Sequence, residues 1–340
     1  MNPLRPIEII GGGLAGLSLG LALQRARVPV TLSEAGGYPR HRVCGETILG
    51  LSDATIERLG LAPFLHDALL HHEVAWFMEG RLASRQHLPS PARALSRYAL
   101  DARLAGALVD AGGQLRTNTR IAPGETRAGW VLTTGRRRSP SPWLGLKIHA
   151  RNLPLHCDLE VHLGEEAYIG LTPVEDGRVN VCGLFRRREL SAKGPDLILA
   201  YLQAAKLAAL AGRLTGADFD AESFCAVAAV DFDPHVPVNR RVALGDACAM
   251  IPPFTGNGMA MAFQSAEVAL DPLLTYARDS ADWPETCAAI QNSLQHRFRL
   301  RLAAADMLHP FLLQPTRQRW LTRLSRAHLL PLRQLYSVLH

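Results

Sequence analysis

The sequence predicts an α/β fold that contains an inserted antiparallel sheet and ends in a helical region. Three observations lead to this expectation. A strand, a glycine-rich turn and a helix follow one another over residues 7–25, strand-type runs dominate residues 144–238, and helical spacing prevails after Met259. With 340 residues the chain suits two closely packed domains.

The N-terminal turn has the features of a dinucleotide-binding unit. The strand Ile7–Ile10 runs into Gly11-Gly12-Gly13-Leu14-Ala15-Gly16, a helix follows, and a second strand ends at Glu34. In this pattern Gly11 permits the tight turn, Gly13 lets the backbone approach a pyrophosphate, and Gly16 lets the helix pack on the strand. The helix start at Leu14 and Ala15 offers N–H groups to phosphate, and Glu34 can accept hydrogen bonds from a ribose. We therefore predict a Rossmann-like nucleotide site.

The composition is that of a globular enzyme and narrows the function classes. Hydrophobic residues make up 48% and charged residues 20%, which argues against disorder. The net charge of +6 does not by itself indicate nucleic acid, and no apolar run is long enough to cross a membrane. The six cysteines form no C-x-x-C pair, so we expect reduced thiols in a cytoplasmic protein and no metal site.

The remaining elements follow from apolar periodicity, with caps and turns at their ends. Ser52 is a plausible N-cap, Gly112-Gly113 suits a helix C-terminus, and Glu175-Asp176-Gly177 suits a hairpin turn. Helices are expected at 52–61, 100–111 and 197–214, and strands at 74–78, 114–121, 130–134, 147–150, 158–163, 167–171, 179–185, 224–230 and 241–244. The nucleotide domain is expected in three parts, 1–75, 96–143 and 239–275, the substrate domain at 76–95 and 144–238, and the helical region at 276–340.

A second glycine-rich segment follows the strand near residue 242. Gly245-Asp246 lies where a strand ends, so the Asp246 carboxylate can bind a polyol. The loop Pro253-Phe254-Thr255-Gly256-Asn257-Gly258-Met259 then leads into a helix, whose first N–H groups can stabilise negative charge on a flat ring. One loop for a pyrophosphate and another for a polyol and an anionic ring indicate FAD rather than NAD.

With these motifs, the sequence resembles FAD-dependent oxidoreductases of the p-hydroxybenzoate hydroxylase fold, and within them the geranylgeranyl reductase branch. Arg40 to Glu46, which includes Arg42 and Cys44-Gly45-Glu46, resembles that branch's segment near the flavin. Arg97 matches an arginine beside the cofactor, and Tyr168 to Phe185 is similar to the hairpin over the substrate. The resemblance covers roughly residues 5–270. It implies bound FAD, with NAD(P)H as a transient reductant.

The resemblance leaves the reaction open. The family's Asp-Gly is here Thr134-Gly135, the hydroxylases' histidine is here Ala249, and the last 70 or so residues lie outside the resemblance. We place hydroxylation of a lipophilic aromatic or polyketide-like molecule first. The alternatives are reduction of a carbon–carbon double bond in a prenyl-like substrate and a flavin-binding module without catalysis.

Cys44 and Glu46 are the candidate catalytic residues. Cys44 could contact the substrate or serve as a small buried hydrophobe. Glu46 could donate a proton beside the flavin or form a salt bridge with Arg40 or Arg42.

Strand alternation suggests which residues line the substrate cavity. Along residues 179–185, the side chains of odd-numbered residues share one face, which is the more uniformly apolar. We therefore expect this face to line the cavity, and the few charges suit a lipophilic substrate. The expected substrate-binding residues are Tyr168, Leu171, Pro173, Val181 and Phe185.

The tail from Arg317 to Leu339 alternates arginines with apolar residues. Helices of this kind either pack an apolar face on the body of the protein or lie on an anionic membrane surface. Packing is the commoner arrangement, and peripheral membrane contact is the alternative.

Overall fold

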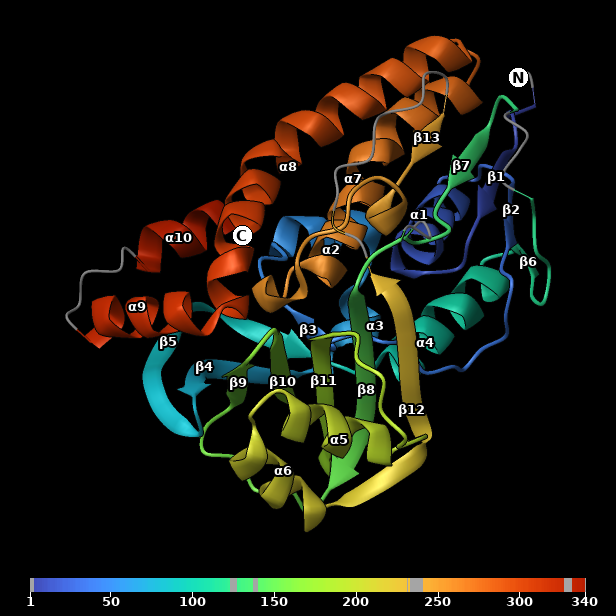
Figure 1. Ribbon diagram of the computed structural model, residues 1–340. Helices are drawn as coiled ribbons and strands as arrows, with labels where there is room; N and C mark the ends of the chain where they lie inside the picture. The colour runs from blue at the N-terminus through green and yellow to red at the C-terminus, as the bar shows by residue number, and fades with distance from the viewer. Residues whose placement is uncertain are drawn as a thin grey trace.

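The computed structural model describes residues 3–122, 127–136, 140–230, 232, 241–326 and 332–339. The expected domain boundary between residues 238 and 239 lies outside the described residues. Figure 1 shows two layered units, one above the other, with helices α8 to α10 along one flank.

Within the described residues, five strands form a parallel sheet in the order β13-β7-β1-β2-β6. The central strand β1 is paired on both sides, with Ile9 opposite Leu32 in β2 and Val131 in β7. The last strand joins from beyond the inserted sheet, as predicted. The strands are β1 (Ile7–Ile10), β2 (Val30–Ser33), β6 (Gln114–Arg116), β7 (Trp130–Leu132) and β13 (Val242–Ala243).

Helices pack around this sheet through apolar side chains. Helix α1, which starts directly after the first glycine turn, is buried along nearly its whole length because α4 and α7 cover it. Ser52 and Ser96 cap α2 and α4 by accepting hydrogen bonds from Thr55 and Ala99. The helices are α1 (Leu14–Arg25), α2 (Asp53–Leu59), α3 (Ala62–Leu65), α4 (Arg97–Asp110) and α7 (Gly258–Ala277).

Eight further strands of the described chain form the second sheet, in the order β12-β8-β11-β10-β9-β4-β5-β3. Its pairs are antiparallel except β4 with β9, so the sheet is mixed and not purely antiparallel as expected. The expected boundary at residues 75/76 falls inside β4, because this strand already begins at Leu69. The strands are β3 (Thr47–Ile48), β4 (Leu69–Met78), β5 (Arg81–Ala94), β8 (Trp143–Arg151), β9 (Leu159–Gly164), β10 (Ala167–Val174), β11 (Arg178–Arg186) and β12 (Asp218–Val230).

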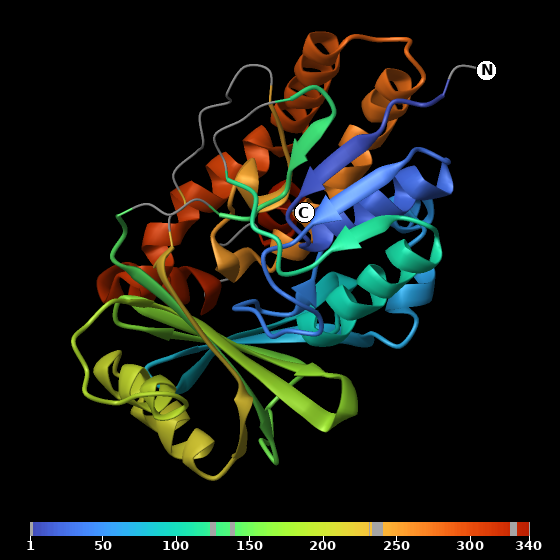
Figure 2. The same ribbon diagram turned by 90° about the vertical axis from the view of Figure 1, so that its right-hand side faces the viewer.

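A pair of helices covers one face of the second sheet. The single helix expected at 197–214 is two helices, α5 (Asp196–Ala204) and α6 (Ala208–Thr215), because Lys206 between them has a φ of 61°. Figure 2 shows this pair beneath the sheet and the parallel unit above it. The other face of the sheet is therefore turned towards the nucleotide unit.

The C-terminal region consists of α8 (Trp283–Leu313), α9 (Pro315–Arg326) and α10 (Leu332–Leu339). Asp282 and Glu285 form a capping box at the start of α8, which runs from the parallel unit down to the second sheet. There α9 packs against β5. Among the described residues, no helix has the length and apolar character that a membrane crossing requires.

Candidate functional site

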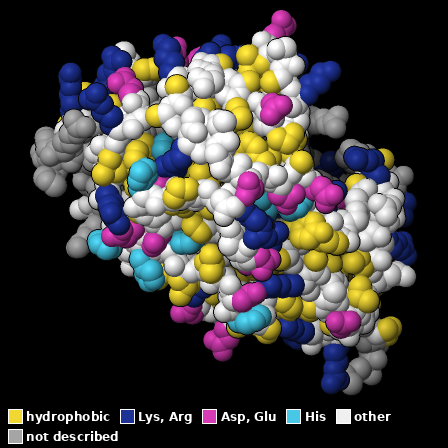
Figure 3. Space-filling model, turned by 90° about the horizontal axis from the view of Figure 1, so that it is seen from below, with side chains coloured by type: hydrophobic (Ala, Val, Ile, Leu, Met, Phe, Trp, Pro, Cys, Tyr) yellow, Lys and Arg dark blue, Asp and Glu magenta, His cyan; other side chains and the backbone are white. Residues whose placement is uncertain are grey.

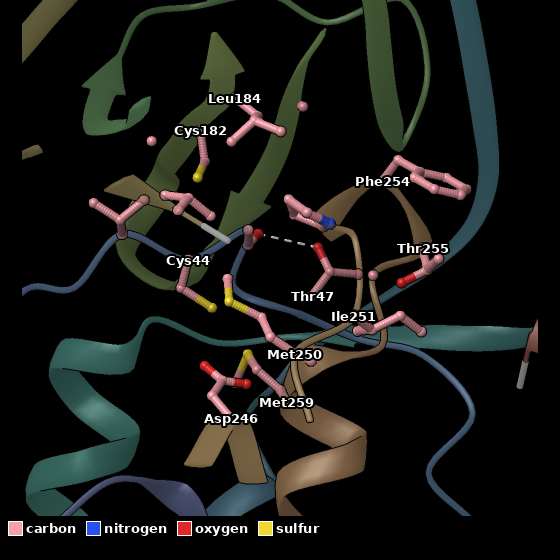
Figure 4. A pocket seen from close by; sticks show the side chains of 18 of the residues that line it. Cys44, Thr47, Cys182, Leu184, Asp246, Met250, Ile251, Phe254, Thr255 and Met259 are labelled. Atoms are coloured by element: carbon pink, nitrogen blue, oxygen red, sulfur yellow. Dashed lines mark hydrogen bonds between the residues drawn. The ribbon is translucent and has the colours of Figure 1, made fainter. Parts of the chain in front are cut away.

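The two sheets and the C-terminal helices enclose one large cavity of about 1420 Å³. The glycine turn after β1 and the Gly245-Asp246 segment line one end, and strands β8 to β11 line the other. Figure 4 shows Asp246 and Met259 at one side of this pocket, Cys182 and Leu184 at the opposite side, and Cys44 between them. The sequence predicted both glycine-rich segments at the first of these ends.

The three motif glycines meet different surroundings. A Cβ on Gly11, whose φ is 111°, would lie 2.3 Å from the carbonyl oxygen of Thr133, and one on Gly16 would lie 2.2 Å from that of Gly11. These two glycines are required by close backbone packing. A Cβ on Gly13 would meet nothing within 4 Å. The space above Gly13 belongs to the cavity and is free to receive a phosphate group.

Glu34 lies beside this turn and is held by several donors. Its Oε2 accepts a hydrogen bond from Gly12 N at 2.6 Å, and its Oε1 accepts from Gly36 N at 3.0 Å and from Arg40 at 2.8 Å. Burial raises the pKa of Glu34, but the Gly12 N–H and the charges of Arg42 and Arg40 outweigh it, so the net pKa is lowered. The carboxylate is therefore charged and in place to accept from a ribose.

Arg42 and Arg97 share a partner that the sequence analysis did not assign to the site. Arg97 donates to both carboxylate oxygens of Asp101 at 2.7 and 2.8 Å, and Arg42 Nε donates to the same group at 2.9 Å. Asp101 is buried on α4, four residues after Arg97. Burial lowers the pKa of Arg97, but the charge and hydrogen bonds of Asp101 outweigh this effect, so the net pKa is raised and the Arg97 guanidinium stands charged at the cavity wall.

Asp246 carries a carboxylate that no described residue hydrogen-bonds. It lines the cavity, and burial raises its pKa. The preceding Gly245 has a φ of 58°, donates its N–H to Ser265 Oγ at 2.9 Å, and would place a Cβ 3.3 Å from Ala15. The two glycine segments thus touch each other, and the unpartnered Asp246 oxygens remain for a ligand.

The loop before α7 also lies at the cavity. Pro253, Gly256, Gly258 and Met259 line it, and a Cβ on Gly258 would meet nothing within 4 Å. Asn257, which was also expected to bind the cofactor, is not among the residues that line the cavity, and its side chain is fully buried and donates to the carbonyl of Leu339 in α10. The loop itself stands at the positive end of α7 as predicted.

Glu46 does not lie beside the cavity, which corrects its expected role as a proton donor there. Its Oε2 accepts from His149 Nε2 at 2.6 Å, and its Oε1 accepts from Arg97 N at 3.0 Å and lies 3.6 Å from Lys147 Nζ. Lys147 in turn lies 3.1 Å from His41 Nδ1. Glu46, Lys147 and His149 are 0% exposed. The ion-pair alternative was right, but its partners are on β8 and are not Arg40 or Arg42.

Cys44 lies at the cavity, as expected, on the loop that Glu46 fastens to β8. Its carbonyl accepts from Asn180 at 2.9 Å, and its Sγ accepts from Glu46 N at 3.4 Å. Burial raises the pKa of Cys44, so the group is a neutral thiol and not a nucleophilic thiolate. The adjacent Gly45 would place a Cβ in open space and leaves the floor of the cavity free.

The expected substrate face of the hairpin is turned away from the cavity, although Tyr168 and Leu171 are among the residues that line it. The side chains of Leu171, Val181 and Phe185 belong to the hydrophobic cluster that β10 and β11 form with α5 and α6. Pro173 shares their face, since it pairs with Val179. This face is uniformly apolar because it packs against α5 and α6. The cavity-facing residues of the hairpin are Tyr168, Gly170, Thr172, Cys182 and Leu184.

This assignment predicts opposite effects for two neighbouring residues. We expect Leu184→Trp to narrow the cavity and weaken binding of the amphiphilic dye 8-anilinonaphthalene-1-sulfonate by about tenfold, since a lost apolar contact is worth about 1–3 kcal/mol. Val181→Ala should cost roughly 1–2 kcal/mol of unfolding free energy and leave dye affinity unchanged. Dye titration and denaturant unfolding check the pair. Equal dye affinity of the Leu184→Trp and parent proteins would contradict the assignment.

Solved structures share this architecture over nearly the whole chain. A p-nitrophenol 4-monooxygenase of Pseudomonas putida superposes with a TM-score of 0.74 at 14% identity, covering 100% of this chain and 97% of that one. The chain has the fold of FAD-dependent monooxygenases. A probable FAD-dependent monooxygenase of Pseudomonas aeruginosa superposes with a TM-score of 0.71 at 16% identity, covering 93% of this chain and 98% of that one. The halogenase PltM superposes with a TM-score of 0.73 at 16% identity, covering 98% of this chain and 85% of that one. The p-hydroxybenzoate hydroxylase fold is thereby confirmed.

Sequence comparison adds one curated relative. Menaquinone reductase of Mycolicibacterium smegmatis is 27% identical over 127 residues, which is 36% of this chain and 31% of that protein. The match thus spans about a third of the relative's length. No protein-family model matches the chain.

Proposed function

We propose that the chain is an FAD-dependent oxidoreductase reduced by NAD(P)H, which hydroxylates a lipophilic aromatic or polyketide-like molecule. The observation that carries the proposal is the convergence of two glycine segments on one cavity. Gly13 leaves open space beside a helix start, and Asp246 presents a carboxylate without a partner. A dinucleotide with a pyrophosphate and a polyol fits these two features.

The residues present fit FAD, which when bound accepts two electrons from a nicotinamide and passes them to oxygen or to an organic substrate. Gly13 and the start of α1 would hold the pyrophosphate, Glu34 the ribose and Asp246 the ribityl chain. The open backbone at Gly258 would let the positive end of α7 approach the ring. Arg97, fixed by Asp101, adds positive charge at the same wall.

The hairpin side of the cavity sets the substrate class. Leu184, Cys182 and Tyr168 present apolar or uncharged surface. The hydroxyl groups of Thr47 in β3 and Thr172 in β10 hydrogen-bond each other at 3.0 Å. These side chains exclude water and offer no charged partner to a small acid. A bulky lipophilic molecule fits such a wall.

A second candidate is reduction of a double bond or quinone ring in a lipophilic substrate, as in the geranylgeranyl reductase branch. It is favoured by the similarity to menaquinone reductase and by Cys44-Gly45-Glu46, which resembles that branch. In this case the same cavity would admit the substrate but keep oxygen out.

The test uses two probes, 1-naphthol and a short-chain menaquinone, with the purified yellow protein. Hydroxylation predicts oxygen uptake that is stimulated by naphthol and yields a hydroxylated product. Reduction predicts NAD(P)H consumption under nitrogen that depends on the quinone. Oxygen uptake that ends only in peroxide with either probe would contradict both substrate assignments. A yellow protein that neither nicotinamide reduces would favour the inactive flavin-binding module.

A further inference from the structure

We propose that α9, with the adjoining surfaces of α8 and β5, docks on an anionic phospholipid bilayer and opens the cavity to it. The inference rests on the proposed lipophilic substrate and goes beyond it by assigning the surface through which that substrate enters. The surface, called the rim below, comprises Leu82, Met307, Arg317, Arg319, Trp320 and Arg323.

The rim exposes large apolar side chains at the mouth of the cavity. Met307 and Trp320 line the cavity and are 63% and 53% exposed, so they stand where it opens to solvent. Leu82, which is 51% exposed, lies on β5, the strand that α9 packs against. Tryptophan is typical of the interface between water and bilayer, because one part of its ring is apolar and its N–H is polar.

The charge on α9 complements an anionic surface. Residues 315–326 contain no acidic residue, and Arg317, Arg319 and Arg323 are exposed. Arg319 is paired with Glu79 at 2.8 Å, but both side chains are more than half exposed, so water screens the pair. Figure 3 shows Lys and Arg side chains gathered at the left end of the lower face, where α9 lies in Figure 1.

The inner side of α9 belongs to the cavity. Leu321 and Leu324 are half-buried and line it, together with Phe311 and Leu312 of α8. Phe254, in the loop before α7, lines the same cavity deeper inside. A lipid-dissolved molecule that passes Trp320 therefore meets apolar wall as far as the proposed flavin, without crossing bulk water. In this arrangement the arginines of α9 contact the lipid headgroups, and its leucines form the wall along which the substrate enters the cavity.

The experiment is vesicle co-sedimentation of the purified full-length protein. We expect binding to phosphatidylcholine vesicles that contain phosphatidylglycerol, weak binding to phosphatidylcholine alone, and release at high salt. The triple variant Arg317→Gln/Arg319→Gln/Arg323→Gln should lose about 100-fold in partition coefficient, at about one factor of five per arginine near an anionic surface. Trp320→Ser should weaken binding further, by about tenfold, through its lost interfacial contact.

A matched control removes three arginines of the parallel unit, Arg5, Arg58 and Arg116, which changes the net charge equally. This variant should bind like the parent protein. Equal losses in both triple variants, or no binding of the parent protein to anionic vesicles, would overturn the proposal. FAD absorbance is measured in every sample. Vesicle binding without FAD would contradict the proposed function alone, and FAD content without vesicle binding would contradict the docking surface alone.

Discussion

Gly13→Val is expected to abolish FAD binding while leaving the fold intact. A side chain at this position meets no protein atom within 4 Å, so the folded chain has room for it. The same space is where the pyrophosphate must approach the helix start. Loss of two charge-assisted hydrogen bonds to phosphate, at about 1.5–3 kcal/mol each, lowers FAD affinity by at least about 100-fold. Flavin absorbance after purification and FAD titration of the apoprotein measure this effect.

Gly11→Ala is the matched comparison, because it should destabilise the fold itself, whereas Gly13→Val should affect only the binding of FAD. Its methyl group would lie 2.3 Å from a backbone carbonyl, at a φ that side chains rarely adopt. We expect a lower melting temperature of the apoprotein for Gly11→Ala and an unchanged one for Gly13→Val. Stoichiometric FAD in purified Gly13→Val protein would show that the pyrophosphate lies elsewhere.

The parts of the site that could be predicted are those encoded by short stretches of sequence. The turn at residues 11–16 combines a strand end, glycines and a helix start, the Gly245-Asp246 segment directly follows the end of β13, and the loop before α7 combines glycines with a helix start. Such local patterns carry their own backbone requirements. The structure brings them to one cavity because the chain returns to the parallel sheet with β13.

The errors concern choices that local sequence does not determine. Alternation in β11 predicts two faces, but which face meets the cavity depends on α5 and α6, which cover Val181 and Phe185. The partners of Glu46 are likewise distant, at Lys147 and His149 on β8. One signal was available: a lysine and a histidine occur in an otherwise apolar strand, where buried charges require partners.

The same buried cluster leads to the second large expected effect. Glu46→Gln should cost about 3–5 kcal/mol of unfolding free energy at neutral pH, because it leaves Lys147 buried without a countercharge. Glu79→Gln is the matched control, since its pair with Arg319 is exposed, and should cost less than about 1 kcal/mol. Denaturant unfolding measures both. A Glu46→Gln cost as small as that of Glu79→Gln would show that the cluster does not hold the loop of Cys44.

The pH dependence separates the charge of Glu46 from its packing. Burial raises its pKa, but the hydrogen bond from His149 and the charge of Lys147 outweigh burial, so the net pKa lies below the usual value of 4.5. When the pKa of a carboxyl group is lower in the folded state than in the unfolded state, its charge stabilises the fold fully at pH values above the unfolded-state pKa. This stabilisation is lost as the pH falls through the folded-state pKa. The difference between parent and Glu46→Gln should therefore shrink below about pH 4.5. Glu46→Gln/Lys147→Met should recover much of the loss at neutral pH, since it removes both charges together. A cost that stays constant with pH and is not relieved in the double variant would assign the effect to packing alone.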